Sequence, residues 1–429
     1  MGFVIGHGIV TDGIELFIED GAILIEGEKI AAIGPTAELR GRGDKFYDLG
    51  GRLVLPGLVN FHHHLYSALA TGISPAGPTD TFVQILENLW WRLDRALDDE
   101  TIYYSAVHGI MDSVAHGVTT IFDHHASMGF IRGSLEIIEK AFREAGINGL
   151  LCFEISDRAG RETLKDQIEE NVNFWEIHRD NPNVKGIMGL HANFTLSEET
   201  LREIARSKPE EMGIHIHCGE DRHDFDFCRK LGYSGPVDRL NAFGLLNDRT
   251  ILAHAIHLSE RDYRLIDEKK PIVVSNPESN ANNQVGKMDR DRIREFVLGT
   301  DGMSGDMVQT LRSMYLLGKG HNEDFEALRK LFFETSRKIL SRFFPNRGGL
   351  EVGNYADIAV LDYVPVTPIS LENLMGHLIF GAKNAKAHMA IANGRIVYHN
   401  GKFAFVDAEK VRPGIRRAAK KLWDKFRKV

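Results

Sequence analysis

Short apolar runs alternate with amphipathic stretches through the middle of the chain. The runs that we predict as strands cover residues 53–60, 117–123, 147–154, 185–191, 213–218, 249–255, 271–275 and 296–300. Buried parallel strands have this appearance, because helices cover both faces of their sheet. Eight strand-and-helix units over about 290 residues suit a (β/α)8 barrel, whose usual size is ~250 residues before insertions. We therefore predict an α/β fold with a TIM barrel over residues 53–349.

The two ends of the chain instead alternate apolar and polar residues. Residues 21–35 alternate around the turn EGEK, and residues 353–405 contain two NG dipeptides, which favour tight hairpin turns. We predict that residues 1–52 and 350–405 form a small β-sandwich domain built from both termini. Residues 406–429 are predicted as a basic C-terminal helix that packs Leu422, Trp423 and Phe426 on the protein's own body, with a partner or subunit contact as the alternative.

Composition and charge narrow the classes of function. The formal net charge of −8 and the pI near 6.2 argue against nucleic acid or an anionic membrane as a partner. Three cysteines form no disulfide framework, and the first residues lack the features of a secretory signal. No apolar stretch approaches the roughly 20 residues of a membrane span. We predict a cytoplasmic protein, and a homodimer because dimers are the commonest oligomers.

Histidines and a carboxylate stand where the predicted barrel strands end, which is the catalytic face of such a barrel. His62 and His64 in LVNFHHH are two apart, so along a strand both imidazoles point to the same side. IHIHCGE ends its strand with His217, and ILAHAIH and VLGTDG contain His254 and Asp301. Imidazole and carboxylate suit a borderline divalent ion. We predict one such ion, Zn²⁺ first and Fe²⁺ or Mn²⁺ as alternatives, held by His62, His64, His217 and Asp301.

Neighbouring residues are assigned by the same periodicity. His63 should face away from the barrel centre, and His215 should point inward one layer below the metal. Glu220 falls in the loop above the metal. Lys185 lies six residues before His191, the end of its strand, and so about 20 Å from the catalytic face. We therefore expect one metal rather than two bridged by a carboxylated lysine.

Six fragments in this order resemble the amidohydrolase superfamily: PGLVNFHHHLYSAL, GLHANFTLS, HIHCGE, LAHAIHL, SNPESN and LGTDG. Within it, the chain is similar to the TRZ/ATZ branch, which holds guanine deaminase, S-adenosylhomocysteine deaminase and the triazine hydrolases. HLYSAL, IFDHHAS, SDRAG and NPESN are most similar to SsnA-type aminohydrolases. The resemblance covers essentially the whole chain. One departure is HHH, where Thr or Ser commonly separates the two ligands.

The resemblance implies hydrolytic deamination of an amino-substituted N-heterocycle of purine, pterin or pyrimidine type, with release of ammonia. It implies that the metal activates a water, that His254 and Asp301 orient this water and take up its proton, and that Glu220 protonates the ring nitrogen. Glu220, His254 and Asp301 are thus the candidate catalytic residues. One alternative is a chlorohydrolase or cyclic-amide hydrolase acting on a triazine-like ring. A second is a catalytically inactive barrel that serves as a binding scaffold.

The expected partner is a small heterocyclic substrate, and we expect neither nucleic acid nor membrane. Candidate substrate contacts at the rim of the predicted barrel are Tyr66, Glu87, His124, His125, Asp157, Arg158 and His191. Residues 81–97, TFVQILENLWWRLDRAL, read as an amphipathic helix packed on the barrel. The alternative is a lid that places Trp90, Trp91 or Tyr66 near an aromatic substrate.

Overall fold

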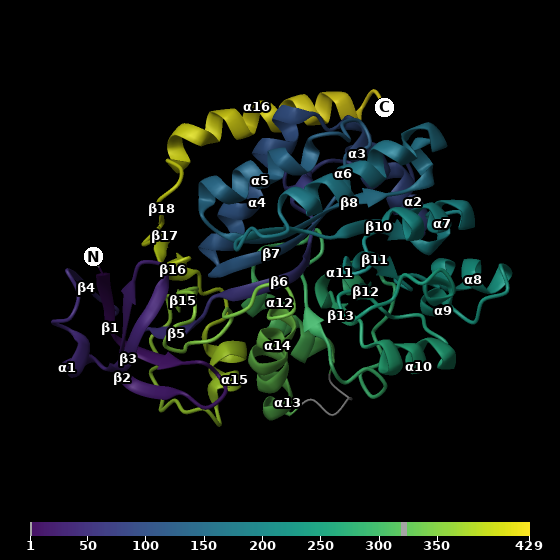
Figure 1. Cartoon of the computed structure of the whole chain (residues 1–429). Helices are drawn as coiled ribbons and strands as arrows, with labels where there is room; N and C mark the ends of the chain where they lie inside the picture. The colour runs from purple at the N-terminus through teal and green to yellow at the C-terminus, as the bar shows by residue number, and fades with distance from the viewer. Residues whose placement is uncertain (1, 319–323) are drawn as a thin grey trace.

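The computed structural model describes residues 2–318 and 324–429, which form a parallel barrel and a second sheet beside it (Figure 1). The barrel strands are β6 (Leu58–His63), β7 (Val118–His125), β8 (Asn148–Ile155), β10 (Met188–Ala192), β11 (Ile214–Cys218), β12 (Ile251–His254), β13 (Ile272–Ser275) and β14 (Val297–Leu298), each parallel to the next, with β9 (Val184–Gly186) added to β8. The N–H groups of Thr300 and Asp301 donate to His62 O at 3.0 and 2.9 Å, which joins the end of the last strand to the first. The predicted barrel is confirmed.

One predicted strand divides into two. β5 (Leu53–Pro56) pairs with β1 (Gly2–Thr11) and β15 (Ile358–Leu361) in the second sheet, whereas β6 begins the barrel at Leu58. Between them, a Cβ on Gly57 would lie 2.2 Å from Thr119 Oγ1, so only glycine fits. The placement of residues 53–56 in the barrel is therefore corrected. A single apolar run hides the division because both halves are buried. The other domain limits stay a prediction.

The second sheet is built from both ends of the chain, as predicted. Its order is β18 (Lys402–Phe403), β17 (Arg395–His399), β16 (Ala387–Ala392), β15, β5, β1, β2 (Phe17–Glu26) and β3 (Lys29–Pro35), with β4 (Lys45–Asp48) on β1. Asn393 and Gly394 have φ values of +52° and +70°, as a tight hairpin turn requires. Ile5, Ile23 and Met389 share one core, so strands from the two termini enclose the same apolar interior.

Helices cover the barrel (Figure 1). Those of eight residues or more are α4 (Asp99–Ala115), α5 (Ser134–Ala145), α6 (Leu164–Ile177), α7 (Glu198–Ser207), α8 (Arg222–Lys230), α10 (Glu260–Lys269), α12 (Met307–Leu317) and α16 (Ala408–Phe426). Shorter α-helices are α1 (Thr36–Leu39), α2 (Phe82–Ile85), α3 (Trp91–Ala96), α9 (Pro236–Ala242), α11 (Pro277–Asn282), α13 (Phe325–Arg329), α14 (Ser336–Leu340) and α15 (Leu374–Gly376). 3₁₀ turns are η1 (Leu65–Ala70), η3 (Asp157–Ala159), η4 (Arg161–Thr163) and η5 (Asn193–Thr195), and π-helical turns are η2 (Leu86–Trp90), η6 (Lys330–Thr335) and η7 (His377–Gly381).

Two of these elements bear on the predictions. Residues 82–96 form one continuous helical stretch, in which the π-helical turn η2 joins α2 directly to α3. The basic helix α16 lies along the outside of α3 and α4 with Leu422 and Phe426 buried (Figure 1).

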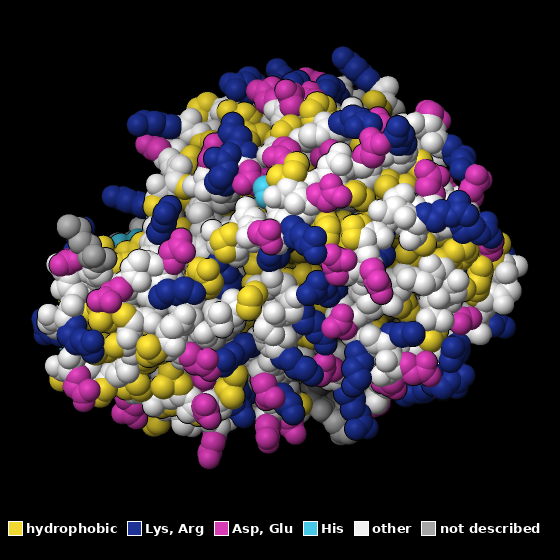
Figure 2. Space-filling model, viewed as in Figure 1, with side chains coloured by type: hydrophobic (Ala, Val, Ile, Leu, Met, Phe, Trp, Pro, Cys, Tyr) yellow, Lys and Arg dark blue, Asp and Glu magenta, His cyan; other side chains and the backbone are white. Residues whose placement is uncertain are grey.

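Acidic and basic side chains are interspersed on the face that Figure 2 shows. Within residues 2–318 and 324–429, no helix combines the length and apolarity needed to cross a bilayer.

Candidate metal centre and active site

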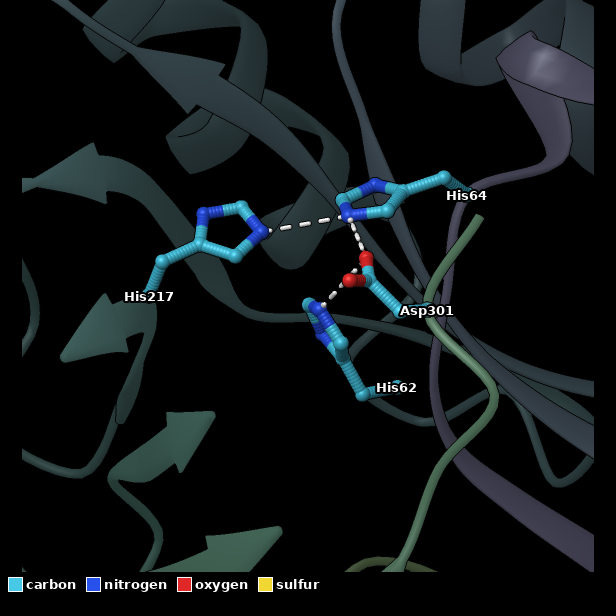
Figure 3. Close-up of side chains that lie close together, drawn as sticks. All are labelled: His62, His64, His217 and Asp301. Carbon is cyan, nitrogen blue, oxygen red and sulfur yellow. Dashed lines mark hydrogen bonds and ion pairs between the residues drawn. The ribbon is translucent and has the colours of Figure 1, made fainter. Parts of the chain in front are cut away.

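Four buried side chains meet at the carboxyl ends of the barrel strands, pointing toward one another (Figure 3). His62 lies in β6, His64 directly follows it, His217 lies in β11 and Asp301 follows β14. Their ligand atoms all lie within 4.8 Å of one another. His64 Nε2 is 3.1 Å from His217 Nε2 and 2.8 Å from Asp301 Oδ1, and His62 Nε2 is 3.4 Å from the same oxygen. The structure thus brings the four predicted ligands together around one point.

The second nitrogen of each imidazole is engaged elsewhere. The Nδ1 atoms of His62, His64 and His217 lie 2.8, 2.6 and 2.9 Å from His215 Nε2, His124 O and His191 O. When Nδ1–H donates to a carbonyl, the Nε2 lone pair is free to bind a metal. His62 Nε2 is buried without a hydrogen-bond partner among the described residues. A buried nitrogen of this kind is costly unless something binds it.

The charges of the cluster follow from burial and contact. Burial lowers the pKa of His62 and His217 well below the usual value, so both imidazoles are neutral. Burial would raise the pKa of Asp301, but its close contacts with His62 and His64 outweigh it and hold that pKa well below its usual range. Burial also opposes charge on His64, yet its contact with Asp301 raises the His64 pKa to about 9. A divalent cation bound here would displace the proton that His64 and Asp301 share.

The predicted catalytic residues form a second group that includes Asp301. His254 Nε2 lies 3.5 Å from Glu220 Oε2 and 3.8 Å from Asp301 Oδ2. Burial, followed by the nearby Asp301 charge, raises the pKa of Glu220 well above its usual value. The raised pKa favours the protonated form of Glu220, and this carboxyl accepts a hydrogen bond from Asn283 Nδ2 at 3.3 Å. Ser279 Oγ donates to Asp301 Oδ2 at 2.5 Å. Two carboxyl groups, those of Glu220 and Asp301, thus lie near the same nitrogen of His254.

Two of these residues adopt a backbone conformation that is unusual outside glycine. His254 and Asp301 have φ values of +73° and +56°. This left-handed region costs a non-glycine residue on the order of 1–3 kcal/mol and is concentrated at functional sites. His254 Nδ1 lies 2.7 Å from Asn280 Oδ1, which orients the imidazole. The strained turns at the ends of β12 and β14 direct both side chains to the same point.

A cavity of about 140 Å³ opens beside the four-residue cluster. It is lined by His64, Tyr66, Ser67, Phe82, Leu86, Trp90, Trp91, Asp94, Glu154, Arg158, His191, His217, Glu220, Ser279, Asn282, Asn283, Asp301, Gly302 and Met303. Aromatic and apolar side chains of residues 82–91 supply one part of this lining. Carboxyl groups and one guanidinium supply another. Such a mixed lining suits a flat, polar-edged ring.

The predicted substrate contacts divide into two groups. Tyr66, Arg158 and His191 line the cavity. The other four are absent from the described lining. Three of them make hydrogen-bond contacts elsewhere: His124 Nε2 lies 3.0 Å from Leu190 O, His125 Nε2 lies 2.8 Å from Ser127 Oγ, and Asp157 accepts from Ser197 N at 2.6 Å. The fourth, Glu87, is exposed on η2. Substrate contact by any of the seven stays a prediction.

Sequence reasoning missed two carboxyl groups in the cavity wall. Asp94 and Glu154 both pair with Arg158, whose guanidinium carbon lies 5.4 Å from the Trp91 ring centroid. Glu154 ends the predicted strand 147–154, which was an available signal, whereas Asp94 lies in an amphipathic stretch with no distinguishing pattern.

A second group of possible ligands consists of His124, Glu154 and His217, which are also close enough together to hold an ion. That group is less suited, since Arg158 already neutralises Glu154 and His217 Nε2 faces His64.

Two further predictions concern His63, which is expected to face away from the barrel centre, and Lys185, which is expected to lie far from the catalytic face. His63 Nδ1 lies 2.8 Å from Asp301 O and 2.9 Å from Thr300 Oγ1, so this ring contacts the strand that closes the barrel. Lys185 lies in β9, and its Nζ donates to Arg179 O at 2.9 Å. Neither side chain belongs to the described groups of candidate ligands.

Comparisons with known proteins point to one family. The family described as "Amidohydrolase family" matches residues 53–397, and a bacterial imidazolonepropionase-like composite domain matches residues 21–42. A 5-methylthioadenosine/S-adenosylhomocysteine deaminase of Pyrococcus furiosus is 28% identical over 95% of this chain and 98% of its own length. A 5'-deoxyadenosine deaminase of Methanococcus aeolicus is 28% identical over 93% and 95%.

Solved structures share the fold. A zinc-bound adenosine deaminase from Xanthomonas campestris has a TM-score of 0.84 at 21% identity and covers 100% of this chain and 99% of its own. A zinc complex of atrazine chlorohydrolase from Arthrobacter aurescens has a TM-score of 0.80 at 21% identity, with 97% and 100% covered. The whole chain, including the sheet built from its two ends, therefore has a known architecture.

Proposed function

Because this chain belongs to the amidohydrolase family, as the match over residues 53–397 shows, we propose that it is a metal-dependent aminohydrolase that deaminates an amino-substituted N-heterocycle. The observation that carries the proposal is the position of the buried carboxyl group of Glu220, whose pKa burial raises, beside four convergent ligand groups at the mouth of the barrel. The curated relatives named as deaminases of adenosine derivatives support the reaction class. The cavity, with its aromatic wall, supports a ring substrate.

The four convergent groups fit a divalent ion. The Nε2 atoms of His62, His64 and His217 together with Asp301 Oδ1 would hold it, and the otherwise unpartnered His62 Nε2 would gain a partner. Nitrogen and carboxylate ligands of this kind bind zinc in catalytic sites. Zinc is the first candidate, with Fe²⁺ and Mn²⁺ next. When bound, such an ion lowers the pKa of a water molecule and polarises the atom under attack.

The chain's own residues account for the proton transfers. Asp301 Oδ2, held by Ser279 and near His254, takes one proton from the attacking water, whose oxygen forms a bond to the ring carbon that carries the amine. Glu220 gives its proton to the adjacent ring nitrogen. Asp301 passes its proton to the amine, the C–N bond breaks and ammonia leaves. The remaining hydroxyl proton returns to Glu220, which leaves a ring carbonyl and a ring N–H.

The Glu220→Gln substitution tests this assignment. Gln cannot donate a proton, so turnover should fall at least about 100-fold, the usual scale of general acid catalysis. Metal content should stay near that of the wild-type protein, because Glu220 is outside the proposed ligand set. His64→Ala is the matched comparison, since it should lower both metal content and turnover. A Glu220→Gln protein with full activity would contradict the proposed role.

The substrate is sought with a panel read out by the leaving group. Ammonia and chloride release should be measured with 5'-methylthioadenosine, S-adenosylhomocysteine, 5'-deoxyadenosine, guanine, pterins, pyrimidines and chlorotriazines. Ammonia release that is lost on chelation and restored by zinc is the expected result. Chloride release alone would favour a chlorohydrolase. Release of neither from a metal-loaded protein across the panel would contradict the proposed aminohydrolase and favour a cyclic-amide hydrolase or a binding barrel.

A further inference from the structure

The basic helix α16, which the proposed reaction does not use, lies along α3 and α4 (Figure 1) and also contacts η1. It therefore touches both ends of a segment that forms one wall of the cavity. We call residues 71–97 the cavity-wall segment, because Phe82, Leu86, Trp90, Trp91 and Asp94 line the cavity from it. Its helical part is the single stretch 82–96, formed by α2, η2 and α3 in succession, with the π-helical turn in its middle. An isolated helix of about this length is only marginally stable in water without packing partners. The position of the wall therefore depends on what holds its ends.

At the start of the cavity-wall segment the contact is Trp423. Its indole Nε1 donates to Leu69 O at 2.8 Å, and the ring lies over Gly72, where an added Cβ would be 3.6 Å from Trp423 Cη2. Leu69 belongs to η1, which begins directly after His64 and contains Tyr66. Trp423 therefore holds the backbone at the point where the chain passes from the candidate metal centre to the cavity wall.

At the end of the segment the contacts are charged. Arg92 Nη2 donates to Phe426 O at 3.3 Å, and its guanidinium carbon lies 5.6 Å from the Phe426 ring centroid. Lys425 Nζ and Lys421 Nζ lie 2.5 and 2.9 Å from Asp98 Oδ2. Burial would raise the pKa of Asp98, but the two lysines outweigh it and hold that pKa well below its usual range. Asp98 is therefore ionised and can pair with both lysines at any ordinary pH.

The helix is packed closely enough to act as a fixed support. Gly414, Ala418, Leu422 and Phe426 are buried at intervals of four, which places them along one face of α16. An added Cβ on Gly414 would lie 2.6 Å from the Tyr104 ring on α4. α16 therefore rests on the rigid barrel helix α4 while it contacts the two ends of the cavity-wall segment.

We propose that α16 is a brace for the cavity wall, and that Trp423 and Lys425 are positioning residues for substrate binding. Neither side chain belongs to the described cavity lining, so they act through Leu69 and Asp98. A loosened wall spends less time in the arrangement that binds substrate, and apparent affinity falls in proportion. The proton transfers of Glu220 and Asp301 are unaffected. The turnover consequence rests on the proposed function, whereas the mobility of the wall does not.

Hydrogen exchange followed by mass spectrometry tests the brace without a substrate. In the full chain, Trp423→Phe removes the indole donor, and the double variant Lys421→Ala/Lys425→Ala removes the Asp98 partners. Loss of a hydrogen bond of about 0.5–1.5 kcal/mol should raise the opening equilibrium about 2- to 10-fold. We expect faster exchange of that order in peptides that cover residues 71–97, with β6, β11 and β12 unchanged. Trp175→Phe and Lys420→Ala/Lys428→Ala are the matched controls and should exchange as the wild-type protein does.

Exchange in residues 71–97 that stays at the wild-type rate in both test variants would overturn the proposal, as would an equal rise in the barrel strands. Once a substrate is known, KM should rise about 2- to 10-fold in the test variants while kcat changes less than about two-fold. A fall in kcat at constant KM would overturn the positioning role. The exchange result stands even if the proposed reaction is not found, so the two failures are distinguishable.

Discussion

The two carboxylate oxygens of Asp301 face different partners. Oδ1 faces His62 and His64, whereas Oδ2 accepts from Ser279 and lies near His254. In the proposed mechanism one oxygen holds the ion while the other accepts a proton. This residue lies three positions after the short strand β14 and has a positive φ of +56°. In this proposal a single residue links metal binding to proton transfer.

Asp123 gives a pH-dependent prediction at the same scale. It is fully buried, its Oδ1 accepts from Leu65 N at 2.7 Å, and burial raises its pKa from 3.8 to about 7. Between pH 3.8 and about 7 the folded protein keeps the Asp123 proton, whereas the unfolded chain has lost it. The contribution of Asp123 to the free energy of unfolding is therefore highest below pH 3.8 and falls as the pH rises to about 7. Asn keeps the acceptor and does not titrate.

The stability gain of Asp123→Asn over the wild-type protein should therefore be greater at pH 8 than at pH 5. The difference should reach about 2.7 kcal/mol, since pH 5 lies two units below the folded pKa of about 7 and each unit is worth 1.36 kcal/mol. Urea unfolding at the two pH values measures it. The exposed Asp267→Asn is the control and should show the same difference at both. An equal gain at pH 5 and pH 8 for Asp123→Asn would show that this carboxyl is not buried as described.

At the scale of elements, the passage from β5 to β6 separates the two sheets within one apolar run. Residues 53–56 pair with strands from the chain termini, and the next strand opens the barrel. Gly57 makes this possible because it packs directly on Thr119. The π-helical turn η2 is a second irregular element, and it presents Leu86 and Trp90 to the cavity. π-helical turns of this kind are frequent at functional sites.

Gly57→Ala should destabilise the protein. The added methyl would overlap Thr119, and overpacking of this kind typically costs about 1–3 kcal/mol. The midpoint of thermal or urea unfolding measures the loss. Gly41→Ala is a matched control, because an added Cβ there meets nothing within 4 Å. Equal stabilities of the two variants would contradict the close contact at Gly57.

At the scale of the whole molecule, a buried polar network joins the second sheet to the barrel. Asp357 Oδ2 accepts from Arg347 Nη1 at 2.6 Å and from Asn148 Nδ2 at 3.2 Å, and Asn148 begins barrel strand β8. Asn393 Nδ2 donates to Asn148 Oδ1 at 3.1 Å from the hairpin of the second sheet. The two sheets are therefore connected by fixed hydrogen bonds as well as by apolar packing. The subunit arrangement and cellular compartment stay predictions.

Asp357→Ala should be strongly destabilising. It leaves the buried guanidinium of Arg347 without its carboxylate, and breaking such a pair typically costs about 3–5 kcal/mol. Urea unfolding measures the loss. Asp362→Ala removes the exposed partner of Arg52 and should cost less than about 1 kcal/mol. Similar losses in the two variants would contradict the role of the network.

Local spacing in the sequence determined much of this protein. The period of two placed His62 and His64 on one side of a strand, and apolar runs that end in His217, His254 and Asp301 indicated the catalytic face of a barrel. These features depend on residues a few positions apart, so periodicity alone reveals them.

Only the tertiary structure decided which surfaces meet. The division at Gly57, the pairing of Arg158 with Asp94 and Glu154, and the bond from Trp423 to Leu69 join segments that have no common local pattern. Such contacts depend on how whole elements pack and on which buried charges neutralise one another. That information lies in the three-dimensional arrangement and not in the spacing along one strand or helix.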